Sequence, residues 1–513
     1  MRENATAACG SLDFPSRAPY ARGMSCVGVE EMRAIENAAF KRGVDPGELM
    51  DRAGEGIAAR LLDHFPHPGT AIAYLGKGNN AGDALVALAI LRQAGWQISL
   101  RSCYPEHEWS TLSRQRLRRL GLTPSDLPTH PAHPLLLLDG LLGIGARGPL
   151  REPLASLATE MTELRQRRGA LIAAMDLPSG LDADSGESQP GAVVADLTLT
   201  VGIPKQGLLT DAATNATGRL FLIPLKDLPL PDRPGIQLFS PDTFGGLLPP
   251  RPHDFHKGNA GRVAILAGSP GMSGAASLAS TAALRAGAGL VTLYLHPDTK
   301  VSTPPEIMVK SHPESVDGAF SSRADARVIG PGLGNSSSAV QSRLLDRLAT
   351  DETPAVLDAD ALNWIASASR QDLLHPQYLI TPHPGEFARL APDLADLPRP
   401  EAAARFVERH PCTLLLKGSH TLIAAPGESI RFNPTGHSGM ASGGQGDVLA
   451  GVCGALLAAG IRPIDAASLG AWLCGRAAER ALTHGHQSPE SMTASDTIAQ
   501  LGGAFDDWRQ RRR

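Results

Sequence analysis

The sequence has few cysteines and few aromatic residues for its length. Its 513 residues include six cysteines, at positions 9, 26, 103, 412, 453 and 474. No two of them have CxxC spacing, which argues against a disulfide scaffold and against a structural zinc site. Aromatic residues make up only 4% of the chain. That scarcity argues against the broad stacking platforms of proteins that bind single-stranded nucleic acid.

The chain also lacks a strong net charge and a long apolar run. Its 48 Lys and Arg against 52 Asp and Glu leave a formal charge of −4, so no electrostatic signal points to nucleic acid. No stretch of about 20 apolar residues occurs that could span a membrane. Residues 1–23 contain no signal-peptide core, and we expect them to form a flexible tail. We therefore predict a cytoplasmic protein with no membrane or nucleic-acid partner, and hypothesise that Met24 is the true start.

The residues that are present indicate two α/β domains. Residues 71–104 read as strand, Gly/Asn-rich turn, helix and strand, which is a βαβ unit and implies a parallel sheet. Buried strands begin again at 135 and 170. The composition becomes proline-rich between about 224 and 254, and the strand–helix alternation restarts at 261. The predicted organisation is a domain over 24–235, a proline-rich linker over 236–250 and a second domain over 251–513.

In the first half, three polar loops follow apolar strands. They begin near Gly76, Asp139 and Asp176, and the carboxyl ends of parallel strands meet at one edge of a sheet. Asn80, Asp139 and Ser179 offer hard oxygen ligands, which suit an alkali or alkaline-earth ion. The alternative is that these residues are ordinary helix caps and Asx-turns.

In the second half, the segment GGQGD (443–447) precedes a long apolar helix. Its backbone N–H groups would form an anion site suited to phosphate, and Asp447 could act as a general base beside it. The alternative is an N-cap aspartate after a glycine turn. The loops around Lys417 and His383 also follow strands and favour a phosphate-handling site, although His383 alone reads more simply as a hydrogen-bonded loop residue.

Taken together, these motifs resemble the family of bifunctional NAD(P)H-hydrate repair enzymes. The first half contains GNNAGD, DGLLGIGARGPL, DLPSGLD and GIPKQG. The second contains HKGNAGRV, PEIM, GPGLG, LDADALN, TPHPGEFARL, KGSHT and GMASGGQGDVLAG, all in family order. The resemblance implies an N-terminal Rossmann-like three-layer domain with epimerase activity and a C-terminal ribokinase-like α/β domain with ADP-dependent dehydratase activity.

The resemblance also implies a function. Hydrated NADH and NADPH would be interconverted between R and S epimers by the first half, and the second would dehydrate the S form while converting ADP to AMP and phosphate. Potassium is expected in the epimerase domain, magnesium in the dehydratase domain, and the protein is expected to be a homo-oligomer. Asp447 would be the base that faces the reacting hydroxyl, and we hypothesise that Asp176 and Lys205 are the acid/base pair of the epimerase.

The binding residues that the resemblance implies fall into four sets. The epimerase substrate would contact Asn79, Asn80, Ala81, Gly82, Asp83, Gly143, Ile144, Gly145, Ala146, Arg147, Gly148, Pro149 and Asp176. Potassium would bind Asn80, Asp139 and Ser179. The S hydrate would contact Ala275, Gly334, His383, Pro384, Gly385, Glu386, Phe387, Ala388, Arg389 and Asp447. The nucleotide would contact Lys417, Gly418, Ser419, His420, Thr421, His437, Ser438, Gly439, Met440, Ala441, Ser442, Gly443, Gly444, Gln445 and Gly446.

Two departures from the family pattern bear on these expectations. Ala81 and Ala84 stand where the family pattern has glycine, which matters only if the backbone there needs a positive φ or touches the ligand. Gln445 stands where threonine is common, and the backbone amides survive that change. Two other functions stay open on the sequence alone: a small-molecule kinase that uses GGQGD, and a first half that only binds nucleotide as a regulatory module.

Overall fold

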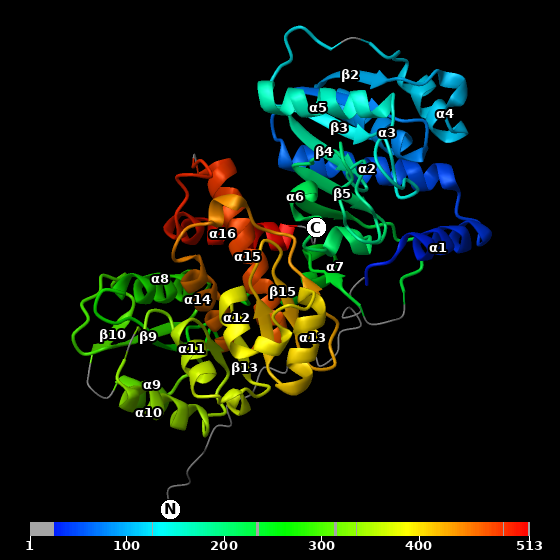
Figure 1. Ribbon diagram of the computed structural model, residues 1–513. Coiled ribbons are helices and arrows are strands. Elements are labelled where there is room, and N and C mark those ends of the chain that lie inside the picture. Colours follow the sequence, from blue (N-terminus) through cyan, green and yellow to red (C-terminus); the bar gives the residue numbers. More distant parts are fainter. Residues whose placement is uncertain are drawn as a thin grey trace, which may run out of the picture.

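The computed structural model describes residues 25–125, 127–231, 235–311, 315–334, 336–485 and 487–510. The predicted tail 1–23 and the hypothesised start at Met24 lie outside these residues. Within the described chain, the strands form two sheets, one in each half of the sequence. Figure 1 shows the two domains side by side, the first in blue to green and the second in green to red.

The first domain is built on a parallel sheet with the strand order β2-β1-β3-β4-β5-β6. Its strands are β1 (Thr70–Leu75), β2 (Gln97–Ser102), β3 (Leu135–Gly140), β4 (Leu171–Met175), β5 (Leu197–Val201) and β6 (Arg219–Ile223). Its helices are α1 (Val29–Lys41), α2 (Pro46–His64), α3 (Asn79–Gln93), α4 (Thr111–Leu120), α5 (Leu154–Arg168) and α6 (Thr214–Thr217).

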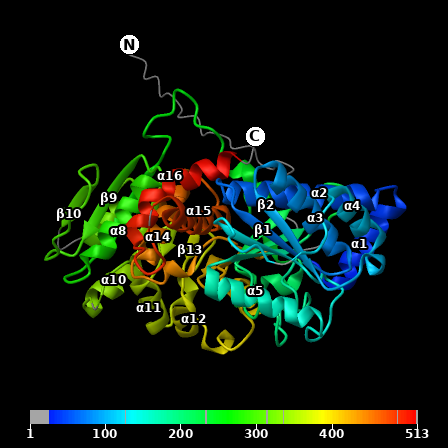
Figure 2. The same cartoon turned by 90° about the horizontal axis from the view of Figure 1, so that it is seen from above.

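Helices cover both faces of this sheet, which explains why its inner strands β1, β3 and β4 are buried along nearly their whole length, whereas the edge strand β2 is partly exposed. Side chains of α2, α3 and α4 share one buried cluster with one face of the sheet, and those of α5 share another with the opposite face. Figure 2 shows α5 on the other side of the sheet from α2 and α3. The predicted three-layer Rossmann-like architecture is confirmed.

The second domain has a mixed sheet with the order β10-β9-β8-β11-β12-β13-β14-β15-β16-β7. The strands are β7 (Gln237–Leu238), β8 (Arg262–Leu266), β9 (Leu290–Leu295), β10 (Met308–Ser311), β11 (Ala326–Ile329), β12 (Ala355–Leu357), β13 (Tyr378–Ile380), β14 (Thr413–Leu416), β15 (Leu422–Ala424) and β16 (Arg431–Phe432). The helices are α7 (Pro241–Phe244), α8 (Ser273–Arg285), α9 (Ser315–Ser321), α10 (Ser338–Leu348), α11 (Asp360–Ser367), α12 (Pro384–Leu390), α13 (Arg399–Arg409), α14 (Gln445–Ala458), α15 (Pro463–His484) and α16 (Ala494–Gln510).

Two helical layers cover this second sheet as well. Helices α8, α14, α15 and α16 share a core with one face, and α9 to α13 pack on the other. The strands from β10 to β14 run parallel, while β15 is antiparallel to both of its neighbours. The second domain is therefore α/β, as the sequence predicts.

The segment 236–250 is more ordered than its proline-rich composition suggests. Its strand β7 pairs in parallel with β16 at the edge of the second sheet, and Phe239 and Phe244 are buried in the core of the second domain. A strand of two residues is too short to show a period, which is why the sequence marks only a linker here. The domain boundary itself stays a prediction.

Each sheet reverses its strand order at one point. In the first sheet β1 lies between β2 and β3, and in the second β8 lies between β9 and β11. Adjacent loops at such a point diverge to opposite faces and leave a crevice at the carboxyl ends of the strands, where ligands bind. The loops after β1 and β3, and those after β8 and β11, are therefore the expected positions of the ligand-binding sites.

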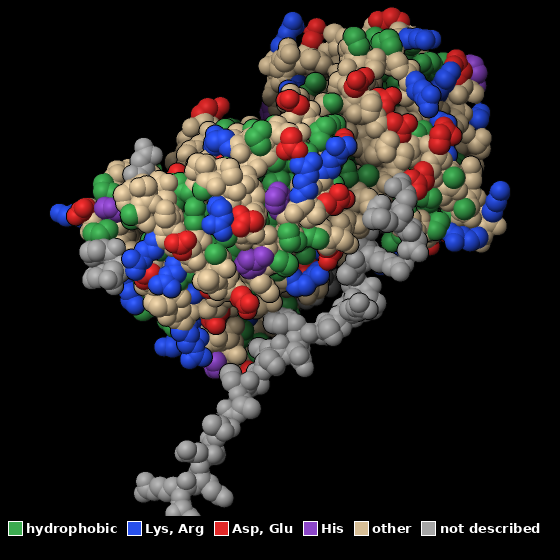
Figure 3. All heavy atoms as spheres, turned by 60° about the horizontal axis from the view of Figure 1, so that its bottom comes forward, with side chains coloured by type: hydrophobic (Ala, Val, Ile, Leu, Met, Phe, Trp, Pro, Cys, Tyr) green, Lys and Arg blue, Asp and Glu red, His purple; other side chains and the backbone are tan. Residues whose placement is uncertain are grey.

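The surface carries charges of both signs. On the face drawn in Figure 3, basic and acidic side chains are interspersed over both domains. No helix in the described part of the chain is both long and apolar enough to cross a membrane.

Candidate active sites

The first site is centred on Asp139, at the end of β3. Its carboxylate is fully buried and accepts hydrogen bonds from the Ser179 backbone N–H at 2.8 Å and the Ser179 hydroxyl at 2.7 Å. The side-chain amide of Asn80 donates to the carbonyl of Leu142 at 2.8 Å. The Leu142 N–H in turn donates to the Ser179 hydroxyl at 3.0 Å. Three segments far apart in sequence thus converge, as predicted for Asn80, Asp139 and Ser179.

The donor set at this point consists of hard oxygens. Carboxylate, hydroxyl, amide and carbonyl oxygens suit an alkali or alkaline-earth ion rather than zinc. Burial raises the pKa of Asp139 to about 6, although the hydrogen bonds from Ser179 oppose the rise. A bound cation would offset the same desolvation by favouring the charged carboxylate. No group of three or more His, Cys, Asp or Glu suited to a metal occurs among the described residues.

Asp176 and Lys205 form an ion pair beside this cluster. The Lys205 ammonium donates to an Asp176 oxygen and, at 2.8 Å, to the carbonyl of Val201. Lys205 is 1% exposed, so a buried ammonium is held against one carboxylate. Asp176 has a φ of +68°, a left-handed conformation that is uncommon outside glycine and is concentrated at functional sites. The two residues of the hypothesised acid/base pair are therefore in direct contact.

Two more carboxyl groups face this pair. Burial raises the pKa of Asp83 well above its usual value, and the negative charges of Asp176 and Glu36 raise it further. Burial also raises the pKa of Glu36, while Lys205 opposes the rise. The protonated form of Asp83 is therefore favoured more than in an exposed aspartate, while Asp176 has an ammonium partner. Two acids in such different environments can serve as proton donor and proton acceptor in one site. The sequence gives no signal for Glu36, which lies on α1 outside every motif.

The two alanines that depart from the family pattern both lie inside α3. Ala81 and Ala84 are fully buried, and as helical residues they do not need a positive φ. The glycine between them is the constrained position, because a Cβ at Gly82 would lie 2.4 Å from the Met50 sulfur. The loop 143–149 follows β3, and the Asn80–Leu142 hydrogen bond fixes its start above the beginning of α3.

The second site lies at the N-terminus of α14. This 14-residue helix begins at Gln445, with Gly444 as its N-cap at φ +92°, so the GGQGD amides point away from the helix into the site. A helix N-terminus carries a partial positive charge and unsatisfied N–H groups, and therefore favours phosphate. A Cβ at Gly446 would lie 3.4 Å from the Lys417 ammonium nitrogen, so the amide cluster and that cation share one space.

Lys417 is the centre of a charged network. Its ammonium lies 2.9 Å from an oxygen of Asp358 and 3.8 Å from one of Glu386. Burial raises the pKa of Asp447 to about 7; the negative charge of Asp358 adds to the rise and Lys417 opposes it. A carboxyl group that titrates near neutrality is suited to general-base chemistry at cellular pH.

The remaining predicted substrate residues surround this network. The Gly334 N–H donates to an Asp360 oxygen at 2.7 Å, and Ala275 lies in the first turn of α8. His383 caps α12 and accepts a hydrogen bond from the Gly385 N–H at 3.0 Å. Its ring is therefore hydrogen-bonded within the loop, which is the simpler of the two interpretations of this residue. His437 accepts from the Gly439 N–H at 3.1 Å in the same way.

The predicted nucleotide loops line one cavity of about 780 Å³. Both segments 417–421 and 437–446 contribute residues to it, among them Lys417, Ser419, His437 and Gly446. The cavity is therefore continuous with the amide cluster at the start of α14. It is also lined by residues of the first domain.

Comparison with known proteins agrees with this arrangement. A family model described as YjeF-related protein N-terminus matches residues 46–207, and one described as NAD(P)H-hydrate dehydratase matches residues 263–500. The Coxiella burnetii protein described as bifunctional NAD(P)H-hydrate repair enzyme Nnr is 34% identical over 496 residues, covering 92% of this chain and 97% of that protein. This chain belongs to that family.

Another relative has the same description. The Escherichia coli protein of the same description is 36% identical over 463 residues, covering 87% of each chain. A solved structure described as ADP/ATP-dependent NAD(P)H-hydrate dehydratase from Bacillus subtilis is 28% identical and covers 53% of this chain and 98% of that one, with a TM-score of 0.46.

The predicted resemblance is thus confirmed, and the individual site residues stay predictions that the geometry supports. Sequence reasoning left Asp358, Asp360 and Glu36 out of both sites. Asp358 follows the apolar run 354–357 inside the motif LDADALN, so its place at the end of a strand was a signal that could have found it.

Proposed function

We propose that the chain repairs hydrated NADH and NADPH with two active sites, one in each domain. The first domain epimerises the R and S hydrates, and the second dehydrates the S hydrate at the expense of ADP, giving AMP and phosphate. The observation that carries the second activity is the position of Asp447, whose pKa is raised to about 7, at the N-terminus of α14 and beside Lys417.

For the dehydratase, hydroxide is a poor leaving group and phosphate is a better one. Asp447 takes the proton of the hydrate hydroxyl as that oxygen attacks the terminal phosphorus of ADP, and the bond to the bridging oxygen breaks to release AMP. The GGQGD amides and Lys417 stabilise the charge on the transferring group. Loss of phosphate together with the adjacent ring proton then restores the double bond. The S hydrate lies near Ala275, Gly334 and the segment 383–389.

For the epimerase, the hydroxyl-bearing carbon is a hemiaminal, which can open and close reversibly. Opening needs a base for the hydroxyl proton and an acid for the ring nitrogen. The Asp176–Lys205 pair provides both kinds of group, and Asp83, whose pKa is raised by burial, is a further acid beside it. The substrate contacts Asn79–Asp83 and the loop Gly143–Pro149 in this proposal.

Two ions accompany these sites in the proposal. Asn80, Asp139 and Ser179 hold potassium, which supplies a fixed positive charge near the epimerase substrate. Magnesium is usually held by one or two carboxylates and the phosphates themselves. Asp358 and Asp360, which lie close to Asp447, would hold it, and it would offset the charge of the ADP phosphates. We further propose that the protein works in the cytoplasm as a homo-oligomer.

The experiment supplies purified protein with ADP, magnesium, potassium and a mixture of R and S hydrates. Full recovery of the reduced nicotinamide absorbance, with one phosphate and one AMP per molecule restored, is expected. Recovery of only the S fraction, beyond slow spontaneous epimerisation, would show that the first domain is inactive. Accumulation of a phosphorylated alcohol without recovery would instead indicate a kinase.

A further inference from the structure

The nucleotide cavity has a wall that belongs to the other domain. Besides the two loops of the second domain, it is lined by residues at the amino ends of β4, β5 and β6 of the first sheet or beside them, namely His64, Arg165, Asp196, Thr214, Asn215 and Arg219. The proposed epimerase residues Asp176 and Lys205 follow the carboxyl ends of β4 and β5. One sheet therefore presents one edge to its own substrate and the opposite edge to the nucleotide loops of its neighbour.

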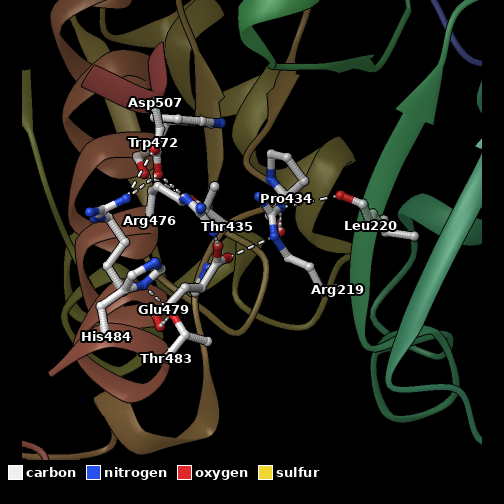
Figure 4. Close-up of polar contacts among 12 residues, drawn as sticks. Arg219, Leu220, Pro434, Thr435, Trp472, Arg476, Glu479, Thr483, His484 and Asp507 are labelled. Carbon is white, nitrogen blue, oxygen red and sulfur yellow. Dashed lines mark hydrogen bonds and ion pairs between the residues drawn. The ribbon is translucent and has the colours of Figure 1, made fainter. Parts of the chain in front are cut away.

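The first contact between the domains fixes the start of loop 437–446. Arg219, at the beginning of β6, lies 2.7 Å from Glu479 on α15, and both side chains are 9% exposed. Arg219 also donates to the carbonyl of Pro434, and Glu479 accepts from the Gly436 N–H at 3.0 Å. Figure 4 shows Arg219 reaching from the first domain to Pro434 and Glu479. The residues directly before His437 are thus held from both sides.

The second contact fixes loop 417–421. Arg399 pairs with Asp211 of the first domain at 2.7 Å and donates to the carbonyls of Leu416 and His420 at 3.2 and 2.8 Å. The His420 ring nitrogen Nδ1 is 3.2 Å from the Thr214 hydroxyl of the first domain. Both nucleotide loops are therefore tied to the same short segment, residues 211–219.

We propose that the first domain completes the nucleotide site of the second. Segment 211–219 forms the far wall of the cavity, and Arg219 is a positioning residue that holds loop 437–446 in its binding conformation. With the phosphates at the amide cluster near Gly446, we expect the nucleoside end of ADP to extend into the cavity that Asn215 also lines. This inference rests on the proposed assignment of ADP to the two loops.

The first test fills the cavity from each side. Asn215 and Ser438 are exposed side chains that line it from the first and second domains respectively. Asn215→Trp and Ser438→Trp place the same bulky group on the two walls without disturbing a core. Both variants are expected to raise the KM for ADP by about tenfold, equivalent to about 1.4 kcal/mol of binding, with the KM for the hydrate changed less than about twofold.

The second test removes the positioning contact. Arg219→Ala leaves Glu479 paired with Arg476, 3.0 Å away, so the fold is expected to survive. The KM for ADP should rise by about tenfold while kcat at saturating ADP changes little, and Arg219→Lys should restore part of the loss. The matched control is Arg60→Ala, which removes an ion pair between α2 and Asp242 of α7 at 2.9 Å, away from both loops. It should leave the KM for ADP unchanged.

Epimerisation is measured in every variant and should stay at the wild-type rate, because the reacting groups lie at the opposite edge of the sheet. If Ser438→Trp leaves the KM for ADP unchanged, the nucleotide assignment itself is wrong. If Ser438→Trp raises it while Asn215→Trp and Arg219→Ala do not, the nucleotide assignment stands and the wall proposal is overturned. An equal effect of Arg60→Ala would reduce the role of Arg219 to general domain docking and would also overturn it.

Discussion

The raised pKa of Asp447 predicts how the dehydratase activity depends on pH. The shift from the usual 3.8 to about 7 corresponds to about 4 kcal/mol against the charged form, at about 1.36 kcal/mol per unit. Since the base must be unprotonated to accept the hydroxyl proton, kcat/KM should fall about tenfold for each pH unit below 7. Above pH 7 it should be level until another group titrates.

Two neighbours should move this inflection in opposite directions. Asp358 raises the pKa of Asp447 and Lys417 lowers it. Asp358→Asn removes a like charge and should shift the inflection of kcat/KM down by about one unit, whereas Lys417→Met removes an opposite charge and should shift it up by a similar amount. Both substitutions should also lower kcat/KM, because Asp358 and Lys417 both lie in the site. The pH at the inflection of kcat/KM is therefore the quantity to compare.

The assay follows AMP release by chromatography from the S hydrate with ADP and magnesium, between about pH 5.5 and 9 at constant ionic strength. Release of AMP is preferred to absorbance because reduced nicotinamides decompose in acid. Asp447→Asn is the control and should lose about a thousandfold or more. Inflections that move the same way in Asp358→Asn and Lys417→Met, or a wild-type inflection below pH 5, would refute the assignment of Asp447 as the base.

Three further outcomes are expected. Asp176→Asn and Lys205→Ala should each reduce epimerisation by about a hundredfold or more while leaving dehydration of pure S hydrate intact; near-normal epimerisation in both would reject the pair. Ser179→Ala should raise the potassium concentration for half-maximal epimerisation by about tenfold, as measured by titration in a choline buffer, and activity indifferent to potassium in the wild type would contradict the site. Ala84→Gly should lower the free energy of unfolding in urea by about 0.5–1 kcal/mol without increasing epimerisation; a faster enzyme would show that the alanine obstructs the ligand.

The sequence predicted what depends on local pattern. Apolar runs that end on Asp139 and Asp176 indicate strand ends, and parallel strands bring such ends to one edge of a sheet. The convergence of Asn80, Asp139 and Ser179 could therefore be predicted from the sequence. The glycines before Asp447 likewise indicate where the following helix begins. The motifs LDADALN and TPHPGEFARL likewise mark loops at the end of the second sheet.

Properties that depend on distant packing could not be predicted. The proximity of Glu36 to Asp83 follows from the packing of α1 against the segments that follow β4 and β5, and no periodicity in the sequence encodes that packing. The pKa of Asp447 depends on desolvation and on Asp358, far away in sequence. The pairing of Gln237 and Leu238 with β16 lies in a segment whose prolines suggest only a linker, and the contact of Arg219 with Glu479 joins two domains that the sequence describes separately.

In the first sheet, the proposed epimerase site lies at the carboxyl ends of the strands and the contact with the second domain lies at their amino ends. This arrangement affects how the substrate passes between the two sites. In the proposed arrangement, an S hydrate formed in the first domain leaves at the end of the sheet opposite the nucleotide loops. We therefore expect it to reach the second site of the same chain through bulk water. Fusion of the two domains then ensures that both activities are present in equal amounts, but it does not channel the S hydrate from one site to the other. An unrelated enzyme able to consume the S hydrate should therefore intercept it in competition with the second domain.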